Sequence, residues 1–285
     1  NVGDIENKGI ELTLQTVNVK GRDFNWTSNL TFSANKNKVL KLATEGARIS
    51  NNDYQATQVG SPISSFYMLN AVGVFRNAQE VSTSPLQHAK VQPGDLKFED
   101  FSKDGKITSD DKKIVGDPWP EYTWGFTNRF SYKNFTLHIS LNGSQGAETY
   151  IINASLMNSA GVQNQLGSIH RWRSESNPGD GRTPRAIRNN YAYSMSNSSY
   201  YLWDASYVRI KNVSLSYSFP RELINSLRLG SLLVYADVAN LFTFTDYPFY
   251  DPEASTTGNS ITSSGLDYGT FPLARTYTFG VKLSF

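Results

Sequence analysis

The chain has 285 residues, with 27 Lys and Arg against 25 Asp and Glu, five Trp, 16 Tyr, 16 Phe and no Cys. A net charge of +2 gives no electrostatic reason to expect nucleic-acid binding. The absence of Cys excludes disulfides, thiol catalysis and Cys-based zinc sites. No run of apolar residues is long enough for a transmembrane helix. Two classes stay open: a soluble all-β binding protein, and a membrane β-barrel, in which only alternate residues meet lipid.

Alternation of apolar and polar residues with a period of two is the main signal along the chain. In 274–285, for example, Tyr277, Phe279 and Val281 alternate with Thr278 and Gly280. Such segments are long: strands of globular proteins commonly have about 5–6 residues, whereas a tilted membrane strand needs about 9–11. Seven segments carry the pattern: 8–17, 24–36, 121–132, 134–143, 205–219, 231–243 and 274–285.

Three further segments carry weaker signals. The alternation changes phase within 205–219, which predicts either a β-bulge near Asn212 or a first half that lies above the membrane. Residues 62–75 alternate poorly and are a candidate for an eighth strand. Residues 220–227 begin with Pro and predict a short helix in a turn.

The connections between the seven segments alternate in length. The short ones are 18–23, Lys133 with its neighbours, and 220–230, and the long ones are 39–120, 144–204 and 244–273. This pattern predicts an antiparallel transmembrane β-barrel segment with short periplasmic turns, long extracellular loops and a periplasmic C-terminus. Because bacterial barrels have even strand numbers, we expect further strands upstream of Asn1. A lectin-like sandwich or jelly roll with long loops is the alternative.

Residues 100–111 follow the pattern of an EF-hand loop, in which oxygen donors at fixed spacing surround a hard cation. Gly105 permits the sharp turn, and Ile107 is expected to anchor the loop by packing. Ser102 in place of Asp or Asn, and a final Asp in place of Glu, make the site weaker than the standard one. An ion-free Asp- and Gly-rich turn is the alternative, and in either case the role is structural. The expected Ca²⁺ ligands are Asp100, Ser102, Asp104, Lys106 through its carbonyl, and Asp111.

Aromatic residues with Arg neighbours mark the second long connection. Arg171, Trp172, Arg173 and Trp203 could contact a sugar or a peptide by stacking and hydrogen bonding. The alternative is that they only pack the loop. The sequence contains no nucleophile elbow, phosphate loop or paired-carboxylate motif, so we do not expect an enzyme.

The C-terminus is an alternating segment whose last residue is aromatic, which is unusual because chain ends commonly fray. An ordinary final strand is the alternative. The residues that define this end are Thr278, Gly280, Leu283 and Phe285.

Several motifs follow one another along the chain: Asn1-Val-Gly-Asp-Ile-Glu-Asn7-Lys-Gly-Ile-Glu-Leu12, Asn35-Lys-Asn37-Lys-Val39, Pro93-Gly-Asp95 through Asp111, Gly116-Asp-Pro-Trp-Pro120, Tyr207-Val-Arg209-Ile-Lys211-Asn212-Val-Ser-Leu215, Asn240-Leu-Phe-Thr243, Asp251-Pro-Glu253 and the last eight residues. In this order they resemble the motifs of SusC/RagA-type TonB-dependent outer-membrane transporters of Bacteroidetes. The resemblance covers nearly the whole chain and places it in the C-terminal part of the barrel.

The resemblance implies that 1–285 supplies about seven strands of a 22-stranded barrel that imports oligosaccharides or peptides with energy passed on by TonB. It implies a SusD-like surface lipoprotein as the extracellular cap, contact with outer-membrane lipid, and no nucleic acid as partner. The plug and the segment that meets TonB would lie in the upstream part of the same transporter. The last eight residues resemble the signal for outer-membrane insertion. The competing interpretations are a secreted carbohydrate-binding β-sandwich with a structural calcium and, ranked last, a fragment of a glycoside hydrolase.

Overall fold

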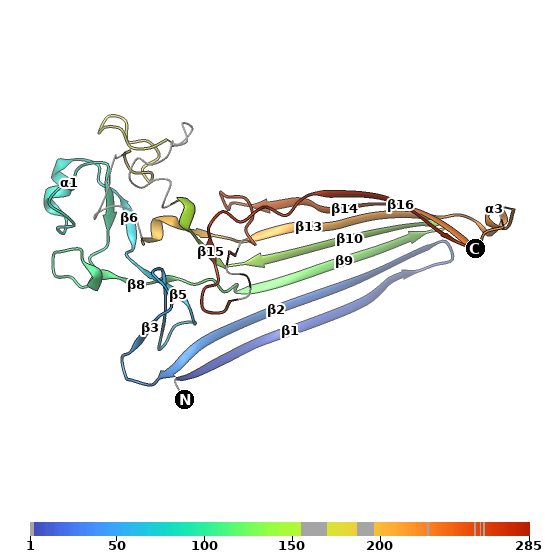
Figure 1. Cartoon of the computed structure of the whole chain (residues 1–285), viewed down its shortest axis with the longest axis horizontal. Coiled ribbons are helices and arrows are strands. Elements are labelled where there is room, and N and C mark those ends of the chain that lie inside the picture. The colour runs from blue at the N-terminus through green and yellow to red at the C-terminus, as the bar shows by residue number, and fades with distance from the viewer. Residues whose placement is uncertain are drawn as a thin grey trace.

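The computed structural model describes residues 3–154, 170–186, 197–226, 228–253, 255–256, 258 and 260–285. One seven-stranded antiparallel sheet, here called the wall, dominates it, and its long strands lie side by side (Figure 1). In spatial order the wall strands are β1 (Gly3–Lys20), β2 (Phe24–Leu42), β9 (Tyr122–Tyr132), β10 (Phe135–Gln145), β13 (Tyr207–Ser218), β14 (Ser231–Thr245) and β16 (Thr276–Ser284). All seven predicted strands are confirmed.

The register of the wall keeps apolar side chains on one face and polar side chains on the other. Leu215 of β13 pairs with Ala236 of β14 and with Leu137 of β10, and the same row continues through Phe130 of β9 to Trp26 of β2. The adjacent row runs through Ser216, Thr136, Ser131 and Asn25. We call these two surfaces the apolar face and the polar face. Because a slip of one residue would exchange them, the alternation in the sequence fixes the pairing.

The apolar face is exposed rather than covered by another layer. Phe279 is 79% exposed, Val281 63% and Ile10 71%. A folded chain in water buries such a surface, because each apolar side chain gains about 1.5–3 kcal/mol on burial. The alternative of a closed β-sandwich is therefore not observed: Tyr277, Phe279, Val281 and Leu283 lie on an open surface and not in a core.

A bulge between two halves of β13 explains the change of phase in the sequence. The pairing of β13 shifts between Ile210 and Asn212 against β14, and between Ser140 and Leu141 against β10. Against β10 the extra residue is Lys211, and against β14 the extra residue lies in β14 at Asn240–Leu241, where Asn240 has a positive φ of +52°. The bulge predicted near Asn212 is confirmed. It returns Ile210 to the apolar face and places Arg209 on the polar face.

The short connections gather at one end of the wall, together with the C-terminus (Figure 1). The first is closed by a hydrogen bond from the Gly21 amide to the Phe24 carbonyl at 2.9 Å. The third holds α3 (Arg221–Ser226), which confirms the predicted turn helix, although Leu227 lies outside the described residues.

The long connections gather at the opposite end and share a hydrophobic core of their own, here called the loop core. Its fully buried members include Phe66, Met68, Tyr150 and Tyr201. Residues 62–75 belong here as two short strands of separate small sheets and are not an eighth wall strand. Their poor alternation suits β5, whose residues are almost all buried on both sides, whereas β6 buries only Val74. The elements of this region are β3 (Arg48–Ser50), β4 (Gln55–Gln58), β5 (Ser65–Met68), β6 (Ala71–Val74), α1 (Ala78–Thr83), β7 (Leu96–Phe98), the 3₁₀ turn Ser109–Asp111, β8 (Lys113–Gly116), β11 (Glu148–Ile151), the 3₁₀ turn Ser199–Tyr201, β12 (Leu202–Asp204) and β15 (Leu266–Asp267).

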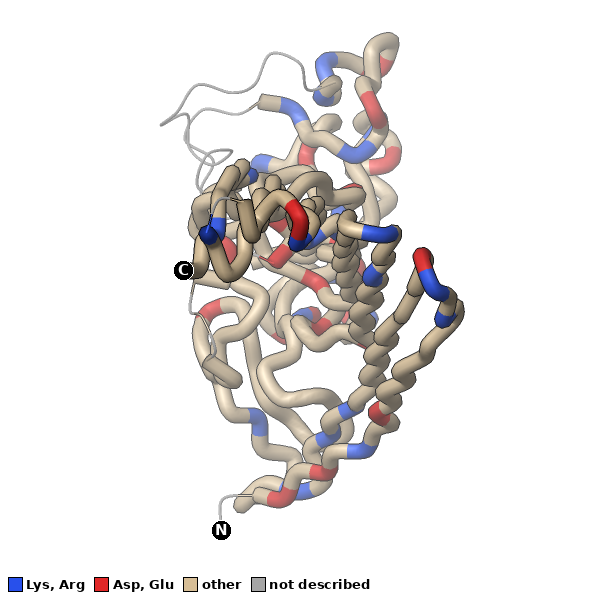
Figure 2. The backbone as a smooth tube through the Cα atoms, turned by 90° about the vertical axis from the view of Figure 1, so that its right-hand side faces the viewer, with Lys and Arg blue, Asp and Glu red and all other residues tan. Residues whose placement is uncertain are grey.

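Charged residues of both signs are interspersed, with long uncharged stretches along the strands (Figure 2). No helix in the described ranges is long and apolar enough to cross a bilayer.

Candidate functional site

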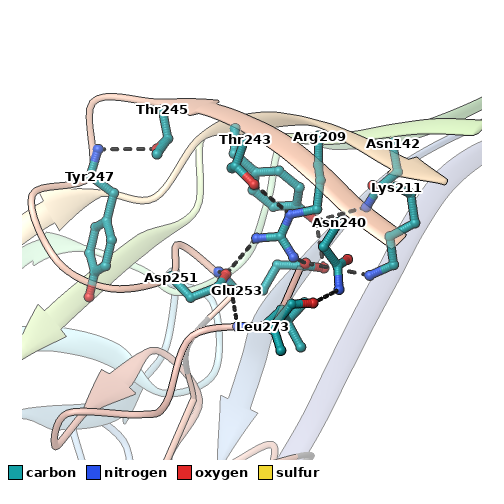
Figure 3. A network of polar contacts seen from close by, with 12 residues as sticks. Asn142, Arg209, Lys211, Asn240, Thr243, Thr245, Tyr247, Asp251, Glu253 and Leu273 are labelled. Atoms are coloured by element: carbon teal, nitrogen blue, oxygen red, sulfur yellow. Dashed lines mark hydrogen bonds and ion pairs between the residues drawn. The ribbon is translucent and has the colours of Figure 1, made fainter. Parts of the chain in front are cut away.

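A buried ion-pair network joins the polar face of β13 to the third long connection (Figure 3). Arg209 is 1% exposed, and its Nη2 donates to Asp251 Oδ1 at 2.6 Å. Its Nη1 donates to Glu253, and its Nε donates to Thr243 Oγ1 at 2.9 Å. A guanidinium with three engaged nitrogens has one preferred orientation, so the network fixes where this connection leaves the wall.

Further hydrogen bonds extend the network in both directions. Asp251 also accepts from the amides of Glu253 at 3.0 Å and Leu273 at 3.1 Å, so the two ends of the third connection meet on one carboxylate. The Tyr207 hydroxyl donates to Glu253 Oε1 at 2.7 Å and accepts from Asn142 Nδ2 at 3.1 Å. The Arg209 guanidinium holds the pKa of Asp251 below its usual range despite the burial that raises it.

Three motifs that are far apart in the sequence therefore meet in one place. Arg209 belongs to 207–215, Thr243 to 240–243, and the two carboxylates to 251–253. Sequence reasoning quoted these motifs and gave none of their residues a role. The available signal was an Arg at a polar-face position together with two acidic residues on either side of a Pro.

A second junction holds the segment 170–186 against residues 92–98. Arg185 Nε donates to the buried Asp95 at 2.7 Å, and the Arg185 amide donates to the Gly94 carbonyl at 2.8 Å. The Trp172 ring lies on Gly94, where an added Cβ would be 2.3 Å from a ring carbon. This junction uses the Pro93-Gly-Asp95 motif.

The structure brings three of the four predicted contact residues together. Arg171, Trp172 and Arg173 line one open groove of about 720 Å³, next to Arg185. Trp203 does not line this groove, and the Arg182 guanidinium lies 4.1 Å from its ring centroid. Trp172 and Trp203 both pack against the loop core. The remaining parts of the connection 144–204, at 155–169 and 187–196, lie outside the described residues.

The EF-hand-like segment forms a tight turn stabilised by its own carboxylates. Asp100 Oδ2 accepts from the Gly105 amide at 2.9 Å, and Asp104 Oδ1 accepts from the Lys106 amide at 2.8 Å. The two oxygens of the buried Asp111 accept from the amides of Ser102 at 3.0 Å and Thr108 at 2.7 Å. Within the described residues, no group of three or more His, Asp or Glu side chains is arranged to hold a metal ion. Calcium at this turn therefore stays a prediction.

Ile107 packs against the loop core, which confirms its predicted anchoring role.

The C-terminal residues continue the alternation to the end of the wall. Thr278 and Gly280 pair with Asp237 and Tyr235 on the polar face, and Leu283 pairs with Leu232. Phe285 is 97% exposed. Gly280 lies beneath the Tyr235 ring, since a Cβ there would be 2.3 Å from Tyr235 Cζ.

Glu148 links the loop core to the start of β9. Its Oε2 accepts from the Asp117 amide at 3.0 Å, and its own amide donates to the Asp117 carbonyl at 3.1 Å. Asp204 is its cross-strand neighbour. Burial, reinforced by the carboxylates of Asp117 and Asp204, raises the pKa of Glu148 to about 7.

We expect the docking of this region to weaken as the pH rises. The folded pKa lies above the unfolded value, so the folded state binds more protons between about pH 4.5 and 7, and the stability declines with pH across that window. Glu148→Gln should reduce this dependence, because the amide keeps the acceptor and cannot ionise. A smaller dependence should stay, because burial also raises the pKa of Asp117. Hydrogen exchange of 115–121 and 148–152 at pH 5.5 and pH 8 measures it. Equal pH dependence in both proteins would contradict the expectation.

Comparisons with known proteins show which proteins share this sequence and this fold. No family model matches the chain. TonB-dependent receptor P3 of Formosa agariphila is 33% identical over all of this chain and 29% of its own length. TonB-dependent receptor SusC of Bacteroides thetaiotaomicron is 28% identical over all of this chain and 27% of its own length.

Solved structures agree with the sequence relatives. The RagAB peptide importer in its open-open state matches with a TM-score of 0.78 at 22% identity, over all of this chain and 29% of that chain. A structure of the RagAB peptide transporter matches with a TM-score of 0.77 at 21% identity, over all of this chain and 30% of that chain. The chain thus spans less than a third of the proteins that it matches. The motifs, the open antiparallel wall and these matches over the whole chain show that the chain is similar to one part of TonB-dependent receptors, SusC among them, and has the fold of the corresponding part of the RagAB structures.

Proposed function

We propose that the chain forms part of the barrel wall and of the substrate-facing loops of a transporter that imports an oligosaccharide or a peptide across the outer membrane. The exposed apolar face, continuous across seven strands in register, carries this proposal, because lipid is the medium in which such a surface is stable. The polar face would line the interior. The segment would have no catalytic role, since its named relatives are receptors and transporters.

The orientation and the partners follow as parts of the same proposal. The short connections and the C-terminus would lie in the periplasm, and the connections 39–120, 144–204 and 244–273 would lie outside the cell. The upstream part of the transporter would complete the barrel at β1 and β16, the two edges of the wall, and would couple it to TonB. A SusD-like lipoprotein would cover the loops, and Arg171, Trp172, Arg173 and Trp203 would be within reach of the substrate. Thr278, Gly280, Leu283 and Phe285 would be read during membrane insertion.

Transport itself is tested by uptake of labelled glycans and peptides into cells with and without TonB. Uptake that requires the receptor gene, TonB and a proton gradient supports the proposal. Passive uptake that is unchanged without TonB would overturn it.

Two adjacent positions in the second half of β13 test which face of the wall meets lipid. Leu215→Cys and Ser216→Cys, each labelled with bimane in a cysteine-free full-length receptor, should report opposite environments, because neighbouring residues of a strand point to opposite faces. We expect quenching by doxyl lipids in nanodiscs only for position 215. Equal quenching at both positions would contradict a membrane wall.

Structural calcium in the turn 100–111 remains part of the proposal. Addition of about 10 mM Ca²⁺ should stabilise the full-length receptor by about 1–3 kcal/mol if the affinity is that of extracellular modules, at about 10⁻⁴–10⁻³ M. Thermal unfolding with Ca²⁺ and with Mg²⁺ measures this. An equal shift with Mg²⁺, or an unchanged Ca²⁺ effect in Asp100→Asn/Asp104→Asn, would argue against the site.

A further inference from the structure

A cavity of about 460 Å³ lies where the polar face of β1, β2 and β9 meets the base of the first long connection. Its lining includes residues from two groups of sequence motifs, and none of these residues belongs to the network around Arg209. Asn7, Asn35 and Asn37 come from the wall strands, and Trp119 and Pro120 come from the segment that leads into β9. We propose that this cavity is a binding subsite for one uncharged sugar ring of a glycan. The inference rests on the proposed transport function and names the substrate class.

The tryptophan of the cavity is held rigidly. Trp119 Nε1 donates to the Ile63 carbonyl at 2.7 Å, and the Ile63 amide donates to Asn37 Oδ1 at 2.7 Å. The Trp119 amide donates to Asp117 Oδ1 at 3.0 Å. Because the indole N–H is already engaged, the ring surface is what Trp119 offers to a ligand, and sugar rings present an apolar C–H face to such a surface.

Two amides of the cavity are free to bind a ligand. Asn7 and Asn35 are exposed, and neither side chain has a hydrogen-bond partner among the described residues. Gly9 is opposite Asn35 in the register, so no side chain covers that amide. Each carboxamide supplies two donor hydrogens and an acceptor. Sugar hydroxyls, which donate and accept at the same atom, fit that combination.

The lining favours a ligand without charge. Ile5, Pro120 and Ile261 provide the apolar surface, and none of the residues that line the cavity is ionisable. The nearby charged residues Glu6 and Lys8 alternate to the opposite face of β1, where they pair with each other at 2.5 Å. An acidic sugar or a charged side chain would lose hydration here without gaining a counter-charge.

A peptide fits the same cavity less well. A common mode of peptide recognition adds a strand to an open sheet edge. Beside this cavity the backbone of β1 pairs with β2 at Asn7↔Asn37 and Gly9↔Asn35, and in the proposed barrel an upstream strand would occupy the other edge of β1. The cavity therefore offers side chains and an aromatic surface rather than a backbone ladder.

Calorimetric titration of the purified full-length receptor tests the subsite. The probes are neutral hexasaccharides of glucose, mannose and xylose, an acidic galacturonate hexasaccharide, and an uncharged hexapeptide. Asn7→Ala/Asn35→Ala should weaken binding of the preferred neutral glycan by about 10-fold, as expected for loss of two or more neutral hydrogen bonds. The matched control is Asn25→Ala, which removes the same side chain from the same face at the other end of β2 and should leave the Kd unchanged.

The outcomes separate the subsite from the transport function. Tight binding of a neutral glycan that weakens in the double variant and not in the control supports the subsite. Equal affinity in all three proteins overturns the subsite, even where TonB-dependent glycan uptake shows that the transport proposal holds. Binding of the acidic glycan alone overturns the expectation of an uncharged ring, and binding of the peptide alone overturns the sugar class. An Asn7→Gln/Asn35→Gln variant with partial recovery would separate lost hydrogen bonding from altered wall structure.

Discussion

Arg209→Met should free the third long connection from the wall, with a cost of about 3 kcal/mol. The substitution leaves Asp251 buried without its counter-charge, and loss of one partner of a buried pair commonly costs about 3–5 kcal/mol. We expect the lower end of this range because the Glu253 carboxylate is partly exposed and stays hydrated when Arg209 is lost. Hydrogen exchange of 246–253 and 266–275 in the full-length receptor measures the effect.

Lys211→Met is the matched control for Arg209. Its ammonium lies 3.9 Å from the same Glu253 and is 44% exposed, so the change should cost less than about 1 kcal/mol. Addition of Asp251→Asn to Arg209→Met should recover part of the loss, because it removes the uncompensated carboxylate. If Arg209→Met has no greater effect than Lys211→Met, the network does not hold the connection.

Gly94→Ala should detach the segment 170–186 from residues 92–98. Gly94 has φ of +91°, where an L-residue costs about 1–2 kcal/mol. An added Cβ would also be 2.3 Å from the Trp172 ring, so the ring must leave its position and the Arg185–Asp95 pair beside it must rearrange. We expect a total cost of about 2–4 kcal/mol, adding the displaced ring to the backbone term.

Gly60→Ala separates these two contributions. Gly60 has the same φ of +91° and has no atom within 4 Å of an added Cβ. It should therefore show the backbone cost alone. The exchange rates of 92–98 and 170–186 should rise in Gly94→Ala and not in Gly60→Ala. Equal effects of the two variants would mean that the Trp172 ring contributes nothing to the junction.

These two junctions give the motifs of the chain a common physical role. The Arg209 network joins the third long connection to the wall by a buried ion pair, and the Asp95–Arg185 pair joins the first and second long connections to each other by a partly buried one. Each ion pair fixes a long connection at one point, which reduces the number of conformations left to the rest of that connection.

The wall was predictable because its signal is local. In β16, Tyr277, Phe279 and Val281 lie on the apolar face, and Thr278 and Lys282 lie on the polar face. The alternation of apolar and polar residues in the sequence predicts this arrangement directly. Even the bulge at Lys211 of β13 was visible, since one extra residue relative to β10 reverses the phase of the residues that follow it. The register then follows from matching apolar rows.

The sequence alone therefore determined the seven strands, the two faces of the wall and the positions of the long connections. Only the tertiary structure decided that Arg209 meets Asp251, that Trp172 lies on Gly94 and lines a groove that Trp203 does not line, and that Asn35 and Trp119 share a cavity. Those contacts join residues that are tens of positions apart, and no periodic pattern relates them. They depend on how each long connection folds back onto the loop core, where packing rather than alternation selects the neighbours.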